Sequence, residues 1–166
     1  MSYKATIKDL FKLAIAVEKA TEELYRGLEA KFAPHQEVAD FWGEYAAEEA
    51  GHAQRLERLR DELNPEQLSA PADPLMLKDV HKILQFSVEN TLKGIKNLED
   101  AYQLVNELEN SETNAIFEFL ITNFSSDKET QSFLRSQLQD HIAKLMITFP
   151  TRFKSAVRRR AIETLE

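Results

Sequence analysis

Glu49 and His52 stand three residues apart in the stretch AAEEAGH, residues 46–52. Residues at this spacing share one face of a helix, so the carboxylate and the imidazole would point the same way. An oxygen and a nitrogen ligand of this kind suit iron, manganese or zinc. The spacing by itself is a weak signal in a chain with 28 acidic residues, so a metal site requires further ligands on neighbouring elements.

Two other glutamates, Glu18 and Glu89, each follow a valine near the middle of an expected helix, on a stripe of apolar residues. An ionised carboxylate buried in a core is costly unless it is paired. A metal ion held by Glu18, Glu49, His52 and Glu89 would offset the charge of all three carboxylates. We therefore predict a metal site at this cluster.

Two more residues are weaker candidate ligands, and one alternative needs no metal. Glu22 lies one turn after Glu18, and His141 lies on the last expected helix. In the alternative, Lys19, Arg55 or Lys93 offsets the carboxylates in an ion-pair network. Lys93 lies four residues after Glu89, so its ammonium could stand beside the carboxylates in place of a cation.

The elements that must position these side chains are helices. The 166-residue chain contains only 4 glycines and 5 prolines, which favours long helices over an all-β fold. A three- and four-residue apolar rhythm predicts four helices, with a turn at 110–112 and either a break or a weak point at 125–127. Their expected bounds are 7–32, 36–63, 75–108 and 116–148. The long connection between the second and third helices, residues 64–74, permits a crossover, so the pattern predicts an all-α four-helix bundle.

We expect this bundle to occupy residues 1–149 and a short basic helix or tail to occupy residues 150–166. The arginine run at 158–160 is interpreted as a solvated helix face, although it could bind an acidic surface, another subunit or nucleic acid. The net charge of −7 makes the chain as a whole a poor nucleic-acid binder. The N-terminus resembles no signal peptide and no 18-residue apolar run occurs, so we expect a cytoplasmic protein without a membrane partner.

The segments VEKATEELYRGL and EEAGHAQRL resemble those of the ferritin-like di-metal carboxylate bundles, and of rubrerythrin in particular. The resemblance covers residues 8–145 and implies a Glu from each of two helices and a Glu-x-x-His from each of the other two. Glu18, Glu49, His52 and Glu89 match by position. The fourth helix departs from the pattern, because the residue three before His141 is a leucine.

The resemblance implies one or two iron ions, with manganese or zinc as possible substitutes, and redox chemistry on peroxide or oxygen. The chain has no cysteine and hence no rubredoxin-type centre, so an external donor would supply electrons. We also expect a homo-oligomer, a dimer in the simplest case. The departure in the fourth helix favours one alternative, a bundle that has lost redox activity and serves as a structural or interaction module. Iron oxidation with storage is a third option. We predict a bound metal, but not an intact di-iron enzyme.

Overall fold

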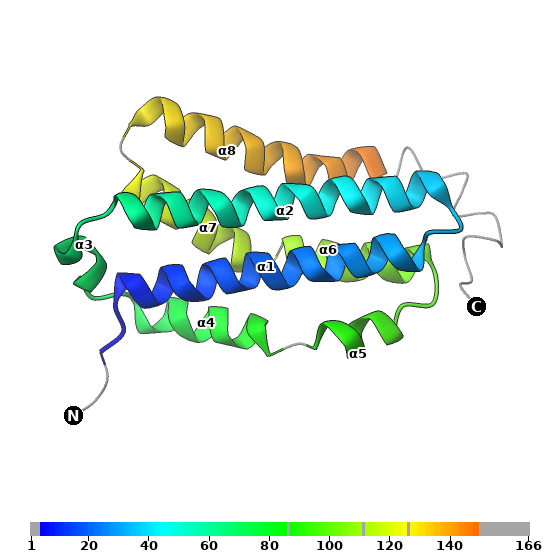
Figure 1. Ribbon diagram of the computed structural model, residues 1–166, viewed down its shortest axis with the longest axis horizontal. Helices are drawn as coiled ribbons and strands as arrows, with labels where there is room; N and C mark the ends of the chain where they lie inside the picture. Colours follow the sequence, from blue (N-terminus) through cyan, green and yellow to red (C-terminus); the bar gives the residue numbers. More distant parts are fainter. Residues whose placement is uncertain (1–3, 86, 111, 126, 150–166) are drawn as a thin grey trace.

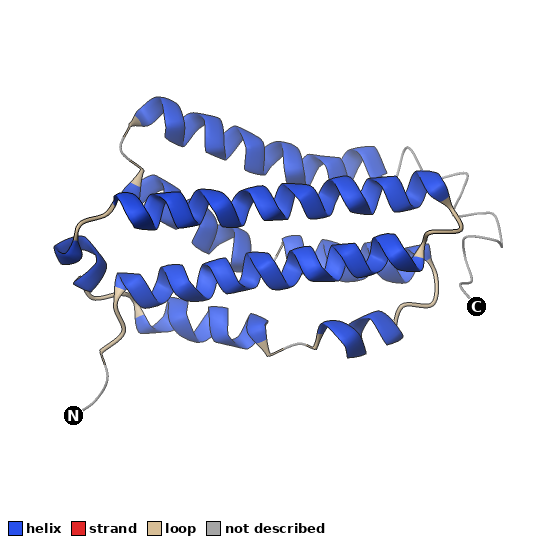
Figure 2. Ribbon diagram, in the orientation of Figure 1, coloured by secondary structure: helices blue, strands red, loops and turns tan. Residues whose placement is uncertain are grey.

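The computed structural model describes residues 4–85, 87–110, 112–125 and 127–149, and every regular element in these ranges is helical (Figures 1 and 2). The elements are α1 (Ile7–Lys31), α2 (Gln36–Glu62), α3 (Pro65–Ser69), α4 (Pro74–Leu84), α5 (Val88–Lys93), α6 (Leu98–Glu109), α7 (Glu112–Phe124), α8 (Lys128–Ala143) and a π-helical turn, η1 (Lys144–Thr148). The predicted all-α bundle is confirmed. The tail predicted at 150–166 lies outside the described residues.

Helices α1 and α2 match the first two expected helices closely and lie side by side in opposite directions (Figure 1). A capping box begins α1: the amide of Asp9 donates to Thr6 Oγ1 at 3.3 Å, and the amide of Thr6 donates to Asp9 Oδ2 at 2.9 Å. Within the described residues, no helix is long and apolar enough to cross a bilayer.

The prediction of a single third helix over 75–108 is wrong. The chain leaves helical geometry after Leu84 and again after Lys93, because the side chains of Ser87 and Asn97 cap new helices instead. Helices α4 and α5 pack against α1 and run its length (Figure 1). The crossover therefore extends from residue 63 to residue 97, well beyond the expected loop at 64–74.

The third long member of the bundle is formed by α6 and α7, which follow one another in the same direction (Figure 1). The predicted reversal at 110–112 is wrong as well, because α7 continues in the direction of α6 and the chain reverses direction only between α7 and α8 (Figure 1). There Asp127 accepts a hydrogen bond from the amide of Thr130 at 2.7 Å and begins α8. The bundle therefore consists of α1, α2, α6–α7 and α8, with α2 and α6–α7 running parallel across the crossover.

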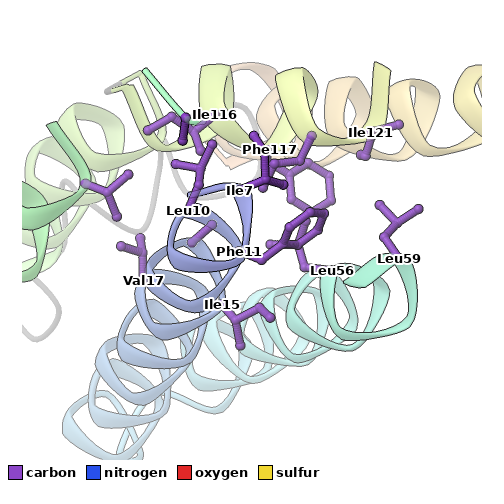
Figure 3. Packing of buried hydrophobic residues seen from close by; sticks show 14 of the residues in the cluster. Ile7, Leu10, Phe11, Ile15, Val17, Leu56, Leu59, Ile116, Phe117 and Ile121 are labelled. Atoms are coloured by element: carbon purple, nitrogen blue, oxygen red, sulfur yellow. The ribbon is translucent and has the colours of Figure 1, made fainter. Parts of the chain in front are cut away.

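The core consists of two apolar clusters at opposite ends of the bundle. The first includes Leu10, Phe11, Leu56 and Phe117 (Figure 3). Leu138 belongs to the same cluster. The second is rich in aromatic residues and includes Tyr25, Phe41, Trp42, Tyr45 and Phe149. Along α1 and α2 the residues between these clusters include buried polar side chains, and this polar layer holds the candidate site.

Candidate metal centre

Five buried side chains from four different helices meet in the polar layer. Glu18 comes from α1, Glu49 and His52 from α2, Glu109 from α6 and His141 from α8. Each of these residues is at most 8% exposed. The spacing of Glu49 and His52 does place both side chains on the inner face of α2, as the helix period requires.

Glu49 is the central carboxylate, because its two oxygens face different imidazoles. Oε1 lies 2.8 Å from His141 Nε2, and Oε2 lies 3.4 Å from His52 Nδ1. Glu18 Oε2 lies 3.8 Å from the same nitrogen of His52, and Glu109 Oε1 lies 3.2 Å from His141 Nε2. Glu49, His52 and His141 each offer a ligand atom, and these three atoms lie within 4.8 Å of one another. This arrangement can converge on a metal ion.

Both oxygens of Glu109 are held from outside the cluster. The Tyr25 hydroxyl donates a hydrogen bond to Oε1, and the Asn114 side-chain amide donates to Oε2 at 3.1 Å. These contacts fix the orientation of the carboxylate at the end of α6, where the chain passes into α7. Outer hydrogen bonds of this kind orient metal ligands in proteins.

His141 is held on its other side. Its ring stacks on Tyr45 with 3.9 Å between centroids and 8° between planes, and the Tyr45 hydroxyl donates to the His141 carbonyl at 2.9 Å. Glu48 Oε2 lies 3.6 Å from His141 Nδ1 and 3.3 Å from Lys144 Nζ. The Glu48 carboxylate lies near Nδ1 without a hydrogen bond to it, and Nε2 is the ring nitrogen directed at the cluster.

The two carboxylates Glu18 and Glu49 have pKa values shifted in opposite directions. Burial, together with the charge of Glu49, raises the pKa of Glu18 well above its ordinary value. Burial opposes ionisation of Glu49, but close contacts with Glu18, His141 and His52 outweigh it and hold the pKa of Glu49 well below its ordinary value. Glu49 is therefore the ionised carboxylate of the pair that it forms with Glu18.

The two imidazoles are basic in this environment. Burial disfavours the charged form of His52, yet Glu18 and Glu49 raise its pKa to about 9. Glu109, Glu48 and Glu49 likewise overcome burial and raise the pKa of His141 to about 12. Without a metal both imidazoles are therefore protonated on both ring nitrogens and positively charged at neutral pH. A metal ion must displace the proton from the nitrogen that it binds.

The structure brings together four of the sequence candidates: Glu18, Glu49, His52 and the weaker candidate His141. The expectation that Glu89 faces this cluster is wrong. Its side chain is 80% exposed and pairs with Lys93 Nζ at 3.3 Å. Glu89 lies on α5, which belongs to the crossover outside the four bundle helices. Lys93 therefore offsets a surface charge and not the buried carboxylates.

The weaker candidate Glu22 lies outside the buried cluster, and the cluster residue Glu109 was not predicted. Glu22 is half-buried, whereas all five residues of the cluster are buried. Glu109 was missed, because the helix was expected to end at residue 108 in a reversal. Two signals point to it: it continues the buried stripe of Leu98, Ala101 and Val105, and it precedes His141 by 32 residues, close to the 34 between Glu18 and His52.

The proposed ion-pair alternative finds little support. Lys19 pairs with Glu57 at 2.8 Å on the surface, while Arg55 lines an open hollow. Across the part of the chain that the structure describes, no lysine or arginine forms an ion pair with Glu18, Glu49 or Glu109. The charges that face these carboxylates come from the two imidazoles.

The donor set fits iron. Carboxylate oxygens and imidazole nitrogens are ligands that iron, manganese and zinc share, and Nδ1 of His52 has no hydrogen-bond partner in the structure although it is buried. A small internal cavity of about 10 Å³ lies beside the three carboxylates, which is room for roughly one water-sized sphere. Its lining consists of Glu18, Thr21, Glu49, Leu108, Glu109 and Asn114.

The bundle with its crossover and the buried carboxylate–imidazole cluster define a ferritin-like protein with a candidate metal centre. The Rubrerythrin family model matches residues 9–138, and the chain belongs to the rubrerythrin family, whose members typically bind iron. The matched region includes Glu18, Glu49, His52 and Glu109 and ends before His141, whose place in the cluster rests on the structure. Neither a curated protein nor a solved structure gave a match.

Proposed function

We propose that the protein binds iron at Glu18, Glu49, His52, Glu109 and His141 and uses it to reduce a small oxidant, either peroxide or oxygen. The observation that carries this proposal is the convergence of ligand atoms from Glu49, His52 and His141, with the buried carboxylates of Glu18 and Glu109 beside the two imidazoles. None of these carboxylates has a lysine or arginine partner in the described residues. Bound iron would supply one-electron redox chemistry and open coordination positions for the oxidant. Manganese or zinc could occupy the same donors.

The residues of the chain have separate tasks in this proposal. Glu49 would bridge the two imidazoles, since its oxygens already face both rings. Glu18 and His52 would release their protons when the ion binds, because imidazole must be neutral and carboxylate ionised to act as ligands. Tyr25 and Asn114 would hold Glu109, and Glu48 would hold His141. Apolar clusters lie on either side of the layer and limit access of water from the two ends of the bundle.

The electrons would come from a separate donor protein, because the chain has no cysteine with which to build a thiolate iron centre of its own. We also propose a homo-oligomer, a dimer in the simplest case.

The direct test is metal analysis followed by an activity measurement. Protein freed of metal by chelation and reloaded anaerobically with ferrous iron should retain the iron through desalting and should consume peroxide with oxidation of that iron. The loaded protein should melt at a higher temperature without chelator than with it, because a ligand that binds the folded state stabilises it.

The rival function is a structural or interaction module that has lost redox activity, and the leucine at position 138 favours it. Absence of retained iron, together with a melting temperature that chelator does not change, would support this module and contradict iron binding. Iron that is retained but not oxidised by peroxide would leave a metal-binding bundle without the proposed reaction.

A surface hollow beside His52 is a candidate entrance for the oxidant. It has a volume of about 440 Å³ and is lined by α2 and α8 residues: Glu48, Gly51, His52, Gln54, Arg55, Arg58, Gln137 and Asp140. His52 belongs to both the hollow and the buried cluster. A side chain added at Gly51 would meet no atom within 4 Å at its Cβ, so the helix can accept a larger residue that fills the hollow.

Replacing Gly51 by leucine is therefore expected to slow iron oxidation by peroxide several-fold while leaving the iron content unchanged. The melting temperature should stay the same or rise, since leucine is a better helix former than glycine. Stopped-flow absorbance of the iron-loaded protein measures the rate. Gly51→Ala is the matched control, because its single methyl group leaves the hollow open. Equal rates for the leucine variant and the control would show that the oxidant enters elsewhere.

A further inference from the structure

The two ligand-bearing helices of the cluster differ at one position. On α2, Glu49 precedes His52 by three residues, and its carboxylate reaches the imidazoles of both helices. On α8 the residue three before His141 is Leu138, which is 5% exposed and belongs to the first apolar cluster. An alkyl side chain therefore occupies the position from which a second bridging carboxylate would reach the site.

This difference affects how many ions the site can hold. Two metal ions in one site lie ~3.5–4 Å apart, and their mutual repulsion in a buried site must be offset by carboxylates. Ferritin-like di-metal sites supply four such carboxylates, two of them from Glu-x-x-His pairs. Here Glu18, Glu49 and Glu109 supply three, and Glu49 is left as a single bridge.

Glu48, a further carboxylate beside His141, cannot take the missing place. Its Oε2 faces Nδ1 of His141, whereas Nε2 is the ring nitrogen that faces Glu49 and Glu109. The same oxygen pairs with Lys144, and the Glu48 side chain is 35% exposed.

We propose that this chain holds one iron ion, bound by the cluster around Glu49, and that Leu138 excludes the second ion of a di-metal site. The inference rests on the proposed iron binding and specifies its stoichiometry. A single ion would change the available redox chemistry, because one iron can exchange only one electron between its ferrous and ferric forms. Two-electron reduction of peroxide would then need a second electron from the external donor in each turnover.

The test compares the wild-type protein with Leu138→Glu and with the matched control Leu138→Gln. Each protein is loaded anaerobically with excess ferrous iron and desalted, and the iron per folded chain is counted by elemental analysis. We expect one ion in the wild type, two in Leu138→Glu and one in Leu138→Gln, whose uncharged amide cannot offset a second cation. After oxidation the wild type should show the paramagnetic resonance signal of an isolated high-spin ferric ion, which a coupled pair of ferric ions would lack.

Each outcome decides a separate claim. Two ions in the wild type would overturn the single-ion inference and leave the proposed iron binding intact. No ion in the wild type would overturn the proposed function, and the inference with it. One ion in a folded Leu138→Glu variant would show that Leu138 is not the residue that excludes the second. If that variant does not fold, the wild-type count and its resonance signal still decide the stoichiometry.

Discussion

Replacing Glu109 by glutamine is expected to weaken iron binding strongly, whereas replacing Glu89 by glutamine is expected to leave it unchanged. Glu109 is buried against His141 and is held by Tyr25 and Asn114, so the substitution removes a charged ligand from the cluster. Loss of even an outer partner of a ligand typically costs ~10–100-fold in metal affinity, and loss of the ligand should cost at least as much. Glu89 is an exposed residue on the crossover.

The two variants form a matched pair, because each exchanges one glutamate for its uncharged isostere. Competition between the protein and a chromophoric chelator gives the iron affinity of each variant, and circular dichroism confirms that both are folded. Equal affinities would place Glu109 outside the metal site. A larger loss for Glu89→Gln would favour the ligand set that the sequence pattern suggested over the one that the structure shows.

The stability of the metal-free protein is expected to fall as the pH rises from about 6.5 to about 9. The folded pKa of His52 is raised from 6.5 to about 9, so the stability it contributes is complete below 6.5 and is lost as the pH passes through 9. For His52 this loss is on the order of 3 kcal/mol, at about 1.4 kcal/mol per pKa unit. His141, with a pKa of about 12, extends the decline above pH 9.

The carboxylates modify this profile on its acid side. The pKa of Glu18 is raised, so its contribution to stability is also lost as the pH rises above its ordinary value. The pKa of Glu49 is lowered, so its contribution is present above its ordinary value of 4.5 and is lost as the pH falls below that. These opposite signs place the greatest stability of the metal-free protein near the ordinary glutamate pKa of 4.5.

Thermal melts of chelator-treated protein at pH 6.5, 7.5 and 9 measure this decline. His52→Gln should make this decline shallower without abolishing it, because His141 still loses its contribution over the same interval. His81→Gln should leave the decline unchanged, because His81 is exposed. The stabilisation that added iron provides should grow over the same interval, since fewer protons compete for the imidazoles. A metal-free melting temperature that is constant from pH 6.5 to 9 would contradict the raised pKa values described for the two imidazoles.

The sequence by itself determined the fold class and the first half of the site. The apolar periodicity of α1 and α2 is continuous, and clear stop signals follow both helices, so their bounds could be predicted to within one residue. Because a helix fixes which residues share a face, the same reasoning placed Glu18, Glu49 and His52 on inner faces. The departure at Leu138 was also visible in the sequence.

The tertiary structure decided which segments form the second half of the bundle. Helices α4 and α5 carry apolar stripes that resemble those of a bundle helix, and periodicity does not show which partner a stripe packs against. The stripe of α4 and α5 packs mainly on α1, which leaves α5 outside the bundle with Glu89 in solvent. The third bundle helix is α6–α7, which brings Glu109 level with His141. The ligand set therefore depended on long-range packing, and local sequence pattern carries little information about it.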